Sequence, residues 1–279
     1  GIMMQYKTLQ TLLLLAGSVT ISHASVAGET LDRIKERGEL IGVMDQAYPP
    51  YSFLNNKNEM DGMDVDLTKE FARRLGVKAK IETPAWEVTT AGNWRGRWDI
   101  CICSMTPDAQ RARSLDFVTH YYSSPAVLVT SVNGNPLTKL ADMEGKKIAA
   151  QQGGSYERYL NQTLKMEGYG AKPVTYPFKA VQVMPYGSED LEYQDLSLGA
   201  GKRIDGLVSN LVTANERIKK TPGKFKLVGD ALYEDPNWIA TDKGDKEWHD
   251  TVVKIFDDMR KDGTLKQISV KWIGSDISR

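Results

Sequence analysis

The chain has 279 residues, of which 41% are hydrophobic and 26% are charged, and it carries 36 Lys and Arg against 36 Asp and Glu. A chain of this length and composition can bury two modest hydrophobic cores. Because basic and acidic residues balance, there is no excess charge of the kind that binds nucleic acid or an acidic membrane surface. A nucleic-acid partner is therefore not expected.

The first residues have the order of features found in a secretory signal peptide. A lysine precedes an apolar stretch at 9–21, and small residues then allow cleavage after Ala24 or after Ala27. The apolar stretch is too short to span a bilayer comfortably, and no later segment approaches the ~18 apolar residues of a membrane helix. A buried N-terminal helix is the alternative. We interpret 1–27 as a cleaved signal peptide that directs the protein to the periplasm, with 1–2 as a cloning scar.

The rest of the chain alternates short apolar runs with amphipathic stretches, which predicts an α/β protein. The first half has predicted strands at 39–44, 77–81, 99–103 and 126–130, and predicted helices at 64–75 and 107–113. We expect Asp64 to be the N-cap of the first helix and Gly76 to end it. Pro107 is expected to open the second helix.

A second α/β unit follows a loop signal at 133–136. The predicted strands are 147–150, 204–208 and 238–241, and the predicted helices are 156–165, 211–219, 246–260 and 265–272. The extended stretches at 126–130 and 238–241 bracket this second unit. If both cross between two lobes, the second unit is inserted into the first, and the pair forms a hinge that can close on a ligand.

The two cysteines, Cys101 and Cys103, lie two residues apart in a predicted strand. Alternate strand residues have Cα atoms ~6.5–7 Å apart, at or beyond the reach of a disulfide. We therefore interpret both as reduced, half-buried core residues. Together with His120 and His249 they offer too few ligands, at the wrong spacing, for a metal site, so no metal is expected.

Ser104, Thr106 and Arg111 follow a predicted strand and enter the next helix. The carboxyl end of a strand followed by a helix N-terminus is where α/β sheets bind ligands. Hydroxyls, free backbone N–H groups and one guanidinium could hold a carboxylate there. The alternative is a capped helix with a solvated arginine.

Two aromatic residues, Tyr48 and Trp86, also follow predicted strands. Their rings could enclose an aliphatic stem or face a cation, or they could simply pack at an interface. Asp45 and Glu87 lie beside them in the sequence. Either acid could bind a cationic side chain or be solvated.

In the second unit, Gln151 and Ser155 flank a Gly-Gly turn between a predicted strand and helix, where backbone N–H groups could face an anion. Asn210 ends another predicted strand and could face the same cleft. We find no Gly-x-Ser-x-Gly motif, no clustered histidines and no paired carboxylates in a hydrolase setting, so no catalytic residue and no cofactor are predicted.

Several motifs together carry a family resemblance that runs from Leu31 to Ile277. They are Tyr48-Pro49-Pro50-Tyr51, Gly62-Met63-Asp64-Val65-Asp66-Leu67, Ser104-Met105-Thr106-Pro107 with Arg111, Gln152-Gly153-Gly154-Ser155, Arg203-Ile204-Asp205-Gly206 and Asp262-Gly263-Thr264-Leu265 with Trp272. Each motif is degenerate, but in this order the chain resembles the polar amino-acid family of bacterial extracytoplasmic solute-binding proteins, family 3 of the ABC-transporter substrate-binding proteins.

The resemblance implies a type II periplasmic-binding-protein fold, with two lobes, each a mixed sheet flanked by helices, joined by two hinge strands. Lobe 1 would comprise 28–129 and 239–279, and lobe 2 would comprise 130–238. The resemblance also implies a monomer that binds a small carboxylate-bearing ligand, an amino acid or derivative. An inner-membrane ABC permease would receive that ligand.

The family pattern also assigns roles to the candidate residues. Tyr48 and Trp86 match the aromatic pair that stacks on the ligand. Ser104, Thr106, Arg111 and Ser155 match the clamp on its α-carboxylate, and Asp45 and Gln151 match positions that contact its side chain. At Asn210 the family usually has an aspartate that neutralises the ligand's α-ammonium. Either Glu87 or another acid replaces that charge, or the ligand has no primary α-ammonium.

Two alternatives to transport remain open at the level of sequence. The first is an enzyme on the same fold that resembles the periplasmic cyclohexadienyl dehydratases, which would need a positioned general acid such as Asp45 or Glu87. The second is a module that reports ligand occupancy to a separate receptor.

Overall fold

The computed structural model describes residues 4, 18 and 28–278. Apart from residues 4 and 18, the predicted signal peptide lies outside the described residues, and so do both of its cleavage sites. The helices are α1 Glu29–Arg37, α2 Met63–Leu75, α3 Trp86–Thr90, α4 Ser155–Leu160, α5 Glu189–Leu196, α6 Leu211–Lys220, α7 Lys246–Lys261 and α8 Thr264–Ile273, with short 3-10 turns η1 Arg111–Arg113 and η2 Leu140–Met143. The strands are β1 Glu39–Val43, β2 Ala47–Tyr48, β3 Ser52–Leu54, β4 Met60–Asp61, β5 Lys78–Glu82, β6 Cys101–Met105, β7 Leu115–Ser131, β8 Lys147–Gln151, β9 Gln182–Tyr186, β10 Gly206–Asn210 and β11 Phe225–Asp242.

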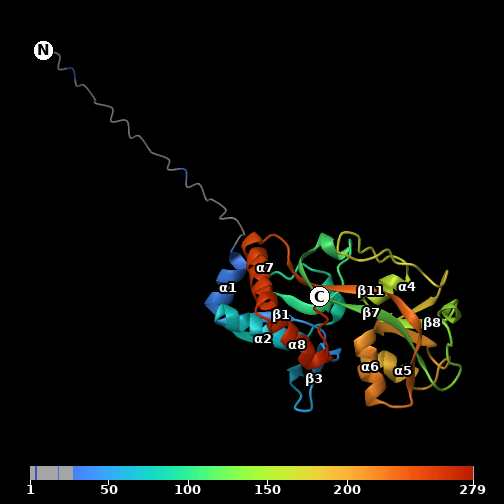
Figure 1. Cartoon of the computed structure of the whole chain (residues 1–279). Helices are drawn as coiled ribbons and strands as arrows, with labels where there is room; N and C mark the ends of the chain where they lie inside the picture. The colour runs from blue at the N-terminus through green and yellow to red at the C-terminus, as the bar shows by residue number, and fades with distance from the viewer. Residues whose placement is uncertain (1–3, 5–17, 19–27, 279) are drawn as a thin grey trace.

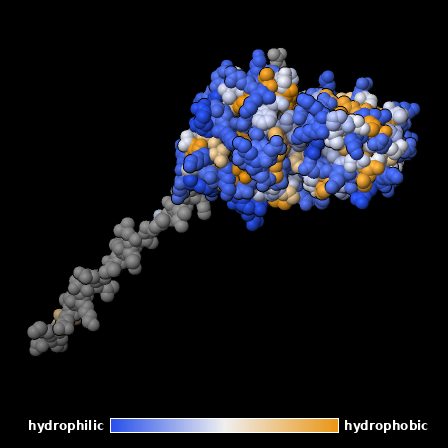
Figure 2. Space-filling view, turned by 90° about the horizontal axis from the view of Figure 1, so that it is seen from below, coloured by the Kyte–Doolittle hydropathy of each residue, from blue (hydrophilic) through white to orange (hydrophobic). Residues whose placement is uncertain are grey.

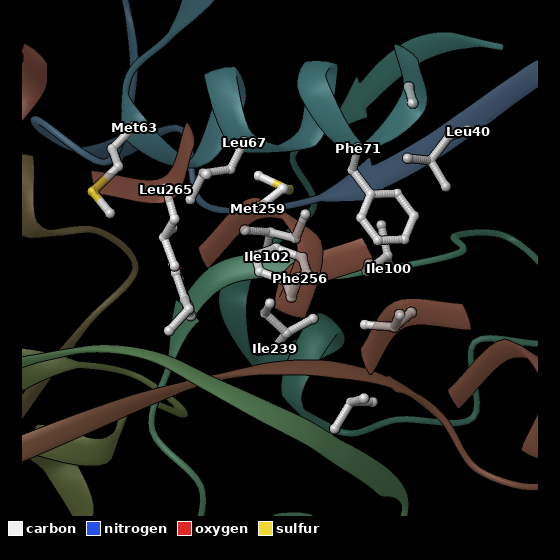
Figure 3. Packing of buried hydrophobic residues seen from close by; sticks show 14 of the residues in the cluster. Leu40, Met63, Leu67, Phe71, Ile100, Ile102, Ile239, Phe256, Met259 and Leu265 are labelled. Atoms are coloured by element: carbon white, nitrogen blue, oxygen red, sulfur yellow. The ribbon is translucent and has the colours of Figure 1, made fainter. Parts of the chain in front are cut away.

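Lobe 1 contains the N-terminal third of the described chain together with its C-terminal helices. Strand β1 pairs in parallel with β5, and a bridge between Gly42 and Ile100 links β1 to the sheet that contains β6. Helices α1, α2, α7 and α8 gather on this side of the molecule (Figure 1). In the core, Phe71 of α2 lies close to Phe256 of α7, with ring centroids 5.9 Å apart, over the strand residue Ile102 (Figure 3).

Lobe 2 continues the main sheet, in which β10 pairs with β8 and β8 with β9, both in parallel. Helices α4, α5 and α6 lie with these strands on the other side of the molecule (Figure 1). Apolar side chains such as Leu128, Ile148, Tyr159 and Val208 form a core that is separate from that of lobe 1. Within the described residues each lobe therefore has its own apolar interior, made of two clusters in each lobe.

Two long strands connect the lobes. The strands β7, of 17 residues, and β11, of 18 residues, pair antiparallel from Leu115↔Asp242 to Ser131↔Phe225. They run side by side between the two parts of the molecule (Figure 1). The extended stretches predicted at 126–130 and 238–241 are the ends of this pair. The prediction was too short because Pro125 and Pro236 interrupt the apolar runs, yet both prolines lie inside the paired ladder.

Most other predicted elements match in place, but the helix predicted at 156–165 ends at Leu160. Two further corrections lie near the candidate site. The N-cap of α2 is Gly62, and Asp64 lies one residue inside the helix with its side chain buried. The helix predicted at 107–113 is only the 3-10 turn η1. The prediction relied on Pro107 as a helix start, but the chain stays irregular until Arg111, whose backbone N–H donates to the Asp108 carboxylate.

The expectation for the cysteines was wrong. Cys101 and Cys103 form a disulfide, and both side chains are fully or almost fully buried rather than half-buried. Their Cα atoms are 4.9 Å apart, which is closer than a regular strand allows. Strand β6 is irregular here: its register on β11 shifts between Trp238 and Ala240, and Ser104 has a positive φ of 58°.

The surface of the described part is mainly hydrophilic on the face seen in Figure 2, with apolar side chains in small scattered groups. Within the described residues, no helix has the length and apolar character needed to cross a membrane. The same part of the chain holds no group of three or more His, Cys, Asp or Glu side chains arranged to bind a metal ion.

Candidate functional site

A cavity lies between the two lobes. Its lining comes from the ends of strands in both lobes and from the hinge strand β11. The lining residues are Asp45, Tyr48, Trp86, Cys103, Ser104, Thr106, Arg111, Gln151, Gly154, Ser155, Tyr156, Glu189 and Asp235. The structure thus brings together eight of the ten residues predicted from the sequence and leaves Glu87 and Asn210 outside the lining.

Arg111 is the basic group of this lining, and its side chain is almost fully buried. Its two terminal nitrogens donate to backbone carbonyls, Nη1 to Thr106 at 2.8 Å and Nη2 to Gly153 at 2.8 Å. The third nitrogen, Nε, is buried and has no partner among the described residues. Burial and the nearby Arg158 lower the pKa of Arg111 to about 10, so that the guanidinium stays charged at neutral pH.

No carboxylate pairs with Arg111 among the residues that the structure describes. A buried cation without an acid in ion-pair contact is costly, because burial removes its hydration and the charges of Asp108 and Asp235 offset that loss only in part. The Arg111 guanidinium also lies 5.9 Å from the ring centroid of Trp86. The arrangement can receive a carboxylate from a ligand.

The hydroxyl of Ser104 is held from within lobe 1. It donates to Asp64 Oδ2 at 2.7 Å, and the hydroxyl of Tyr121 donates to the other oxygen of Asp64 at 2.6 Å. The backbone N–H of Ser104 donates to Tyr121 as well. Burial raises the pKa of Asp64 to about 7, although both hydroxyl donors act against that rise. Asp64 therefore positions Ser104 at the cavity wall.

Thr106 and Ser155 come from different lobes and meet at the cavity, with their hydroxyl oxygens 3.0 Å apart. Thr106 also donates to Asp235 Oδ1 at 2.6 Å. Asp235 lies on the hinge strand β11, and its second oxygen accepts from the hydroxyl of Tyr156 at 3.2 Å. Burial raises the pKa of Asp235 to about 7.

The aromatic residues line the cavity from both lobes. Tyr48 stacks on Tyr51 with ring centroids 5.4 Å apart, and its hydroxyl lies 2.9 Å from that of Tyr156. Trp86 is the first residue of α3 and is mostly buried. The two rings predicted to enclose a ligand, Tyr48 and Trp86, therefore both line the cavity.

A second group of acids lies at another part of the lining. Asp45 accepts from Gln151 Nε2 at 2.6 Å, and Glu189 accepts from the Ser209 hydroxyl at 2.6 Å. Burial raises the pKa of Glu189 to about 7, and the negative charge of Asp45 acts in the same direction. These two acids come from opposite lobes, which indicates a region suited to a hydrogen-bond donor or a cation.

Asn210 is the N-cap of α6 and points its carbonyl oxygen at groups of the protein itself. This oxygen accepts from Val212 N, from Ser124 Oγ at 3.0 Å and from Tyr51 Oη at 3.3 Å. Its amide nitrogen is buried and has no partner among the described residues. Its contact with a ligand stays a prediction.

Glu87, the other residue outside the lining, lies in the first turn of α3. Its Cα and Cβ face Gly153 of lobe 2 so closely that a Cβ on Gly153 would lie 2.8 Å from Glu87 Cβ. The backbone of Glu87 thus marks a point where the lobes touch.

Five residues of the lining were not among the candidate site residues: Cys103, Gly154, Tyr156, Glu189 and Asp235. Cys103 had been assigned to the core, and Gly154 to the turn before Ser155. Tyr156 follows the predicted Ser155 directly and could have been included with it. Asp235 and Glu189 had no such signal, because neither follows a strand that the apolar pattern had located.

Hydrogen bonds hold the two lobes together around the cavity. They include Arg111 to Gly153, Gln151 to Asp45, and Tyr48 to Tyr156. An ion pair between Arg158 and Asp108 lies close by. The structure is therefore the closed form of the hinge.

Two lobes that are joined by a strand pair, with a cavity between them lined by charged, polar and aromatic side chains, define the class of hinged solute-binding proteins. The family model of bacterial extracellular solute-binding proteins, family 3, matches residues 40–275. The chain belongs to this family, and the two-lobed α/β fold predicted from the sequence is confirmed.

Individual solute-binding proteins are similar to this chain over most of its length. The L-cystine-binding protein TcyJ of Escherichia coli strain K12 is 30% identical over 250 residues, which cover 89% of this chain and 88% of that protein. Among solved structures, an ancestral arginine-binding protein bound to glutamine superposes with a TM-score of 0.73 at 27% identity, covering 86% of this chain and 99% of the other. An ancestral amino acid-binding protein, described as a precursor of cyclohexadienyl dehydratase, has a TM-score of 0.74 at 25% identity and covers 88% and 99%.

Proposed function

We propose that this protein binds an amino acid or a related carboxylate in the cavity between its lobes and presents it to an inner-membrane ABC permease. The observation that carries the proposal is Arg111, a buried guanidinium that lines the cavity and has no acid partner among the described residues. A ligand carboxylate would supply the missing charge in a geometry that suits a planar guanidinium. The amino-acid ligands named for the relatives support the same ligand class.

The proposed contacts divide between the lobes. Arg111, Ser104 and Thr106 of lobe 1 bind the carboxylate first, and Ser155 of lobe 2 joins when the hinge closes. Tyr48 and Trp86 cover the ligand, while Asp45 and Gln151 face its side chain. We take 28–129 and 239–279 as lobe 1 and 130–238 as lobe 2. The protein works in the periplasm as a monomer and needs no chemical turnover for this role.

A binding experiment with matched arginine variants tests the proposal. Thermal shift and calorimetry with L-arginine, L-histidine, L-glutamine and L-cystine should identify at least one ligand, and the decarboxylated amine agmatine should bind far more weakly than L-arginine if arginine binds. Arg111→Ala should lose more than about 100-fold in affinity, because a buried charge pair loses one partner. Arg113→Ala removes an exposed arginine of the same turn and should bind like the parent. Binding by Arg111→Ala within two-fold of the parent would overturn the proposal.

A second candidate function is catalysis of the dehydratase type. Asp235 lines the cavity with a pKa of about 7, which suits a general acid, and one structural neighbour is described as a precursor of such an enzyme. Incubation with prephenate or arogenate and ultraviolet detection of the aromatic product separates the two functions. Turnover by the purified protein would favour the enzyme, and tight binding without product would favour transport.

A further inference from the structure

The cavity holds two groups of opposite charge, Arg111 and Asp235, which are hydrogen-bonded but form no ion pair with each other or with another described residue. Arg111 has no acid partner among the described residues, as stated above. Asp235 likewise forms no ion pair in the described part of the chain, although its side chain is almost fully buried. Both line the same cavity. An α-amino acid carries a carboxylate and an ammonium group on one carbon, which is the complement of such a pair.

We propose that Asp235 on the hinge strand receives the ligand's α-ammonium group, in the place of the charge that Asn210 lacks. This inference rests on the proposed function, because it assumes an amino-acid ligand held at Arg111. It assigns the ammonium contact to the hinge rather than to lobe 2.

The hydrogen bonds around Asp235 leave room for this contact. Its oxygens accept one hydrogen bond each, from Thr106 at 2.6 Å and from Tyr156 at 3.2 Å. A carboxylate offers about four acceptor positions, so two remain for an ammonium group. Tyr48 lies 2.9 Å from the Tyr156 hydroxyl and can donate to it, which leaves Tyr156 free to donate to Asp235.

Asn210 is poorly suited to the same task. Its carbonyl oxygen already accepts from the backbone of α6, from Ser124 and from Tyr51, and its side chain does not line the cavity. An amide in this position also supplies no charge. The acid that directly contacts the carboxylate clamp is therefore Asp235, which accepts from Thr106.

The groups around Asp235 set the pKa of its carboxyl, and a bound ammonium group would change that pKa. Burial raises the pKa of its carboxyl to about 7, the hydroxyls of Thr106 and Tyr156 and the charge of Arg111 lower it, and Glu234 raises it. An ammonium group at this position would lower the pKa again. About half of the ligand-free molecules should therefore carry a proton on Asp235 at pH 7 and release it when the ligand binds.

The test uses pairs of probes that differ only in the α-ammonium group. These are L-arginine with 5-guanidinopentanoate, L-glutamine with 4-carbamoylbutanoate, and L-histidine with 3-(imidazol-4-yl)propanoate. The parent should prefer the amino acid of a bound pair by roughly ten- to hundred-fold. Asp235→Asn should reduce that preference to less than about three-fold. Glu234→Gln changes the same charge on the exposed neighbouring residue and should keep the parent's preference at pH 8, where Asp235 is mostly charged with or without Glu234.

Calorimetry of the parent in buffers of different ionisation enthalpy adds a readout that needs no variant. At pH 7 the parent should release roughly half a proton from Asp235 on binding the amino acid. The preference over the des-amino analogue should also be smaller at pH 5.5 than at pH 8, because protonated Asp235 carries no charge.

The outcomes separate the two proposals. If none of the amino acids binds the parent, the proposed function fails. If an amino acid binds but Asp235→Asn keeps the parent's preference, Asp235 is not the ammonium acceptor and the proposed function stands. If Asp235→Asn does not fold, a parent preference that is equal at pH 5.5 and pH 8 would overturn the inference in the same way.

Discussion

Gly153 offers a direct test of whether ligand binding requires the closed form. It lies in lobe 2 with a positive φ of 74°, and a Cβ built on it would lie 2.8 Å from Glu87 Cβ and 2.9 Å from Glu87 Cα of lobe 1. Carbon atoms in contact are normally about 3.5–4.0 Å apart. Gly153→Ala therefore introduces an overlap of roughly 1 Å that exists only while the lobes touch. Opening the hinge relieves the overlap and also breaks the Arg111–Gly153 hydrogen bond.

The size of the effect follows from the cost of overpacking. Forcing an extra carbon into a packed contact costs about 1–3 kcal/mol, which corresponds to roughly 5- to 150-fold weaker binding. Calorimetric titration with the best amino-acid ligand of the parent measures this directly. The alanine also adds backbone strain of about 1–2 kcal/mol at positive φ, which lowers stability in the open and closed forms alike.

Gly145 provides the matched control. It also lies in lobe 2, its φ is 70°, and a Cβ on it would have no atom within 4 Å. Gly145→Ala should lower the melting temperature about as much as Gly153→Ala but bind ligand within two-fold of the parent. If Gly153→Ala also binds within two-fold, the contact between Gly153 and Glu87 does not belong to the ligand-bound form, and the reasoning is refuted.

Three further predictions concern the buried acids and Asn210. Asp64 has a pKa raised from 3.8 to about 7, so between these pH values the folded ligand-free protein binds more protons than the unfolded chain and loses stability as pH rises. Asp64→Asn mimics the neutral acid, and in denaturant unfolding it should remove roughly 3 kcal/mol of the stability that the parent loses between pH 5 and pH 8. An unchanged loss of stability would contradict the raised pKa. Glu189→Gln should lower the ratio of L-arginine to L-citrulline affinity several-fold in calorimetry, because it removes one of the two acids, Glu189 and Asp45, that face the cavity from opposite lobes and favour a cationic side chain. An unchanged ratio would mean that the ligand side chain does not reach these acids. Asn210→Asp should raise amino-acid affinity less than about three-fold, since its carbonyl oxygen is occupied by donors of the protein, and a ten-fold rise would return the ammonium site to this residue.

The sequence predicted the parts of the site that follow apolar strands. Ser104 lies near the end of β6, Thr106 and Arg111 follow that strand, and Gln151 and Ser155 bracket the turn between β8 and α4. The carboxyl end of a strand is a local feature, so a short apolar run is enough to locate it. All five residues line the cavity.

Asp235 could not be found in this way. It lies 129 positions from Thr106, and the two meet only because β11 runs through the middle of the main sheet between β6 and β7. The sequence around Asp235 lacks the apolar residues by which a strand is located, because Glu234, Asp235, Pro236 and Asn237 follow one another there. Strand pairing over a long sequence distance, here Asp235 opposite Ser124, is set by tertiary structure and leaves little trace in local periodicity.

The disulfide between Cys101 and Cys103 was not predicted from the sequence for a different reason. The prediction assumed a regular strand, in which alternate Cα atoms are too far apart. Between Cys101 and Met105 the register of β6 on β11 is irregular, and the Cα atoms of Cys101 and Cys103 are 4.9 Å apart. Irregularities of this size are invisible to pattern-based reasoning but decide whether a covalent bond can form.

The electrostatics of the closed cavity explain why a ligand would favour closure. Burial lowers the pKa of Arg111 to about 10 and raises the pKa of Asp235 to about 7, which means that the closed protein disfavours both charges when it is empty. A zwitterion supplies the opposite charge to each group at once, whereas a ligand with only a carboxylate or only an ammonium leaves one buried charge unsatisfied. A ligand shifts the hinge equilibrium only by its difference in affinity for the open and closed forms. That difference should therefore be largest for amino acids, and a des-amino analogue held by Arg111 alone should leave a larger fraction of molecules open.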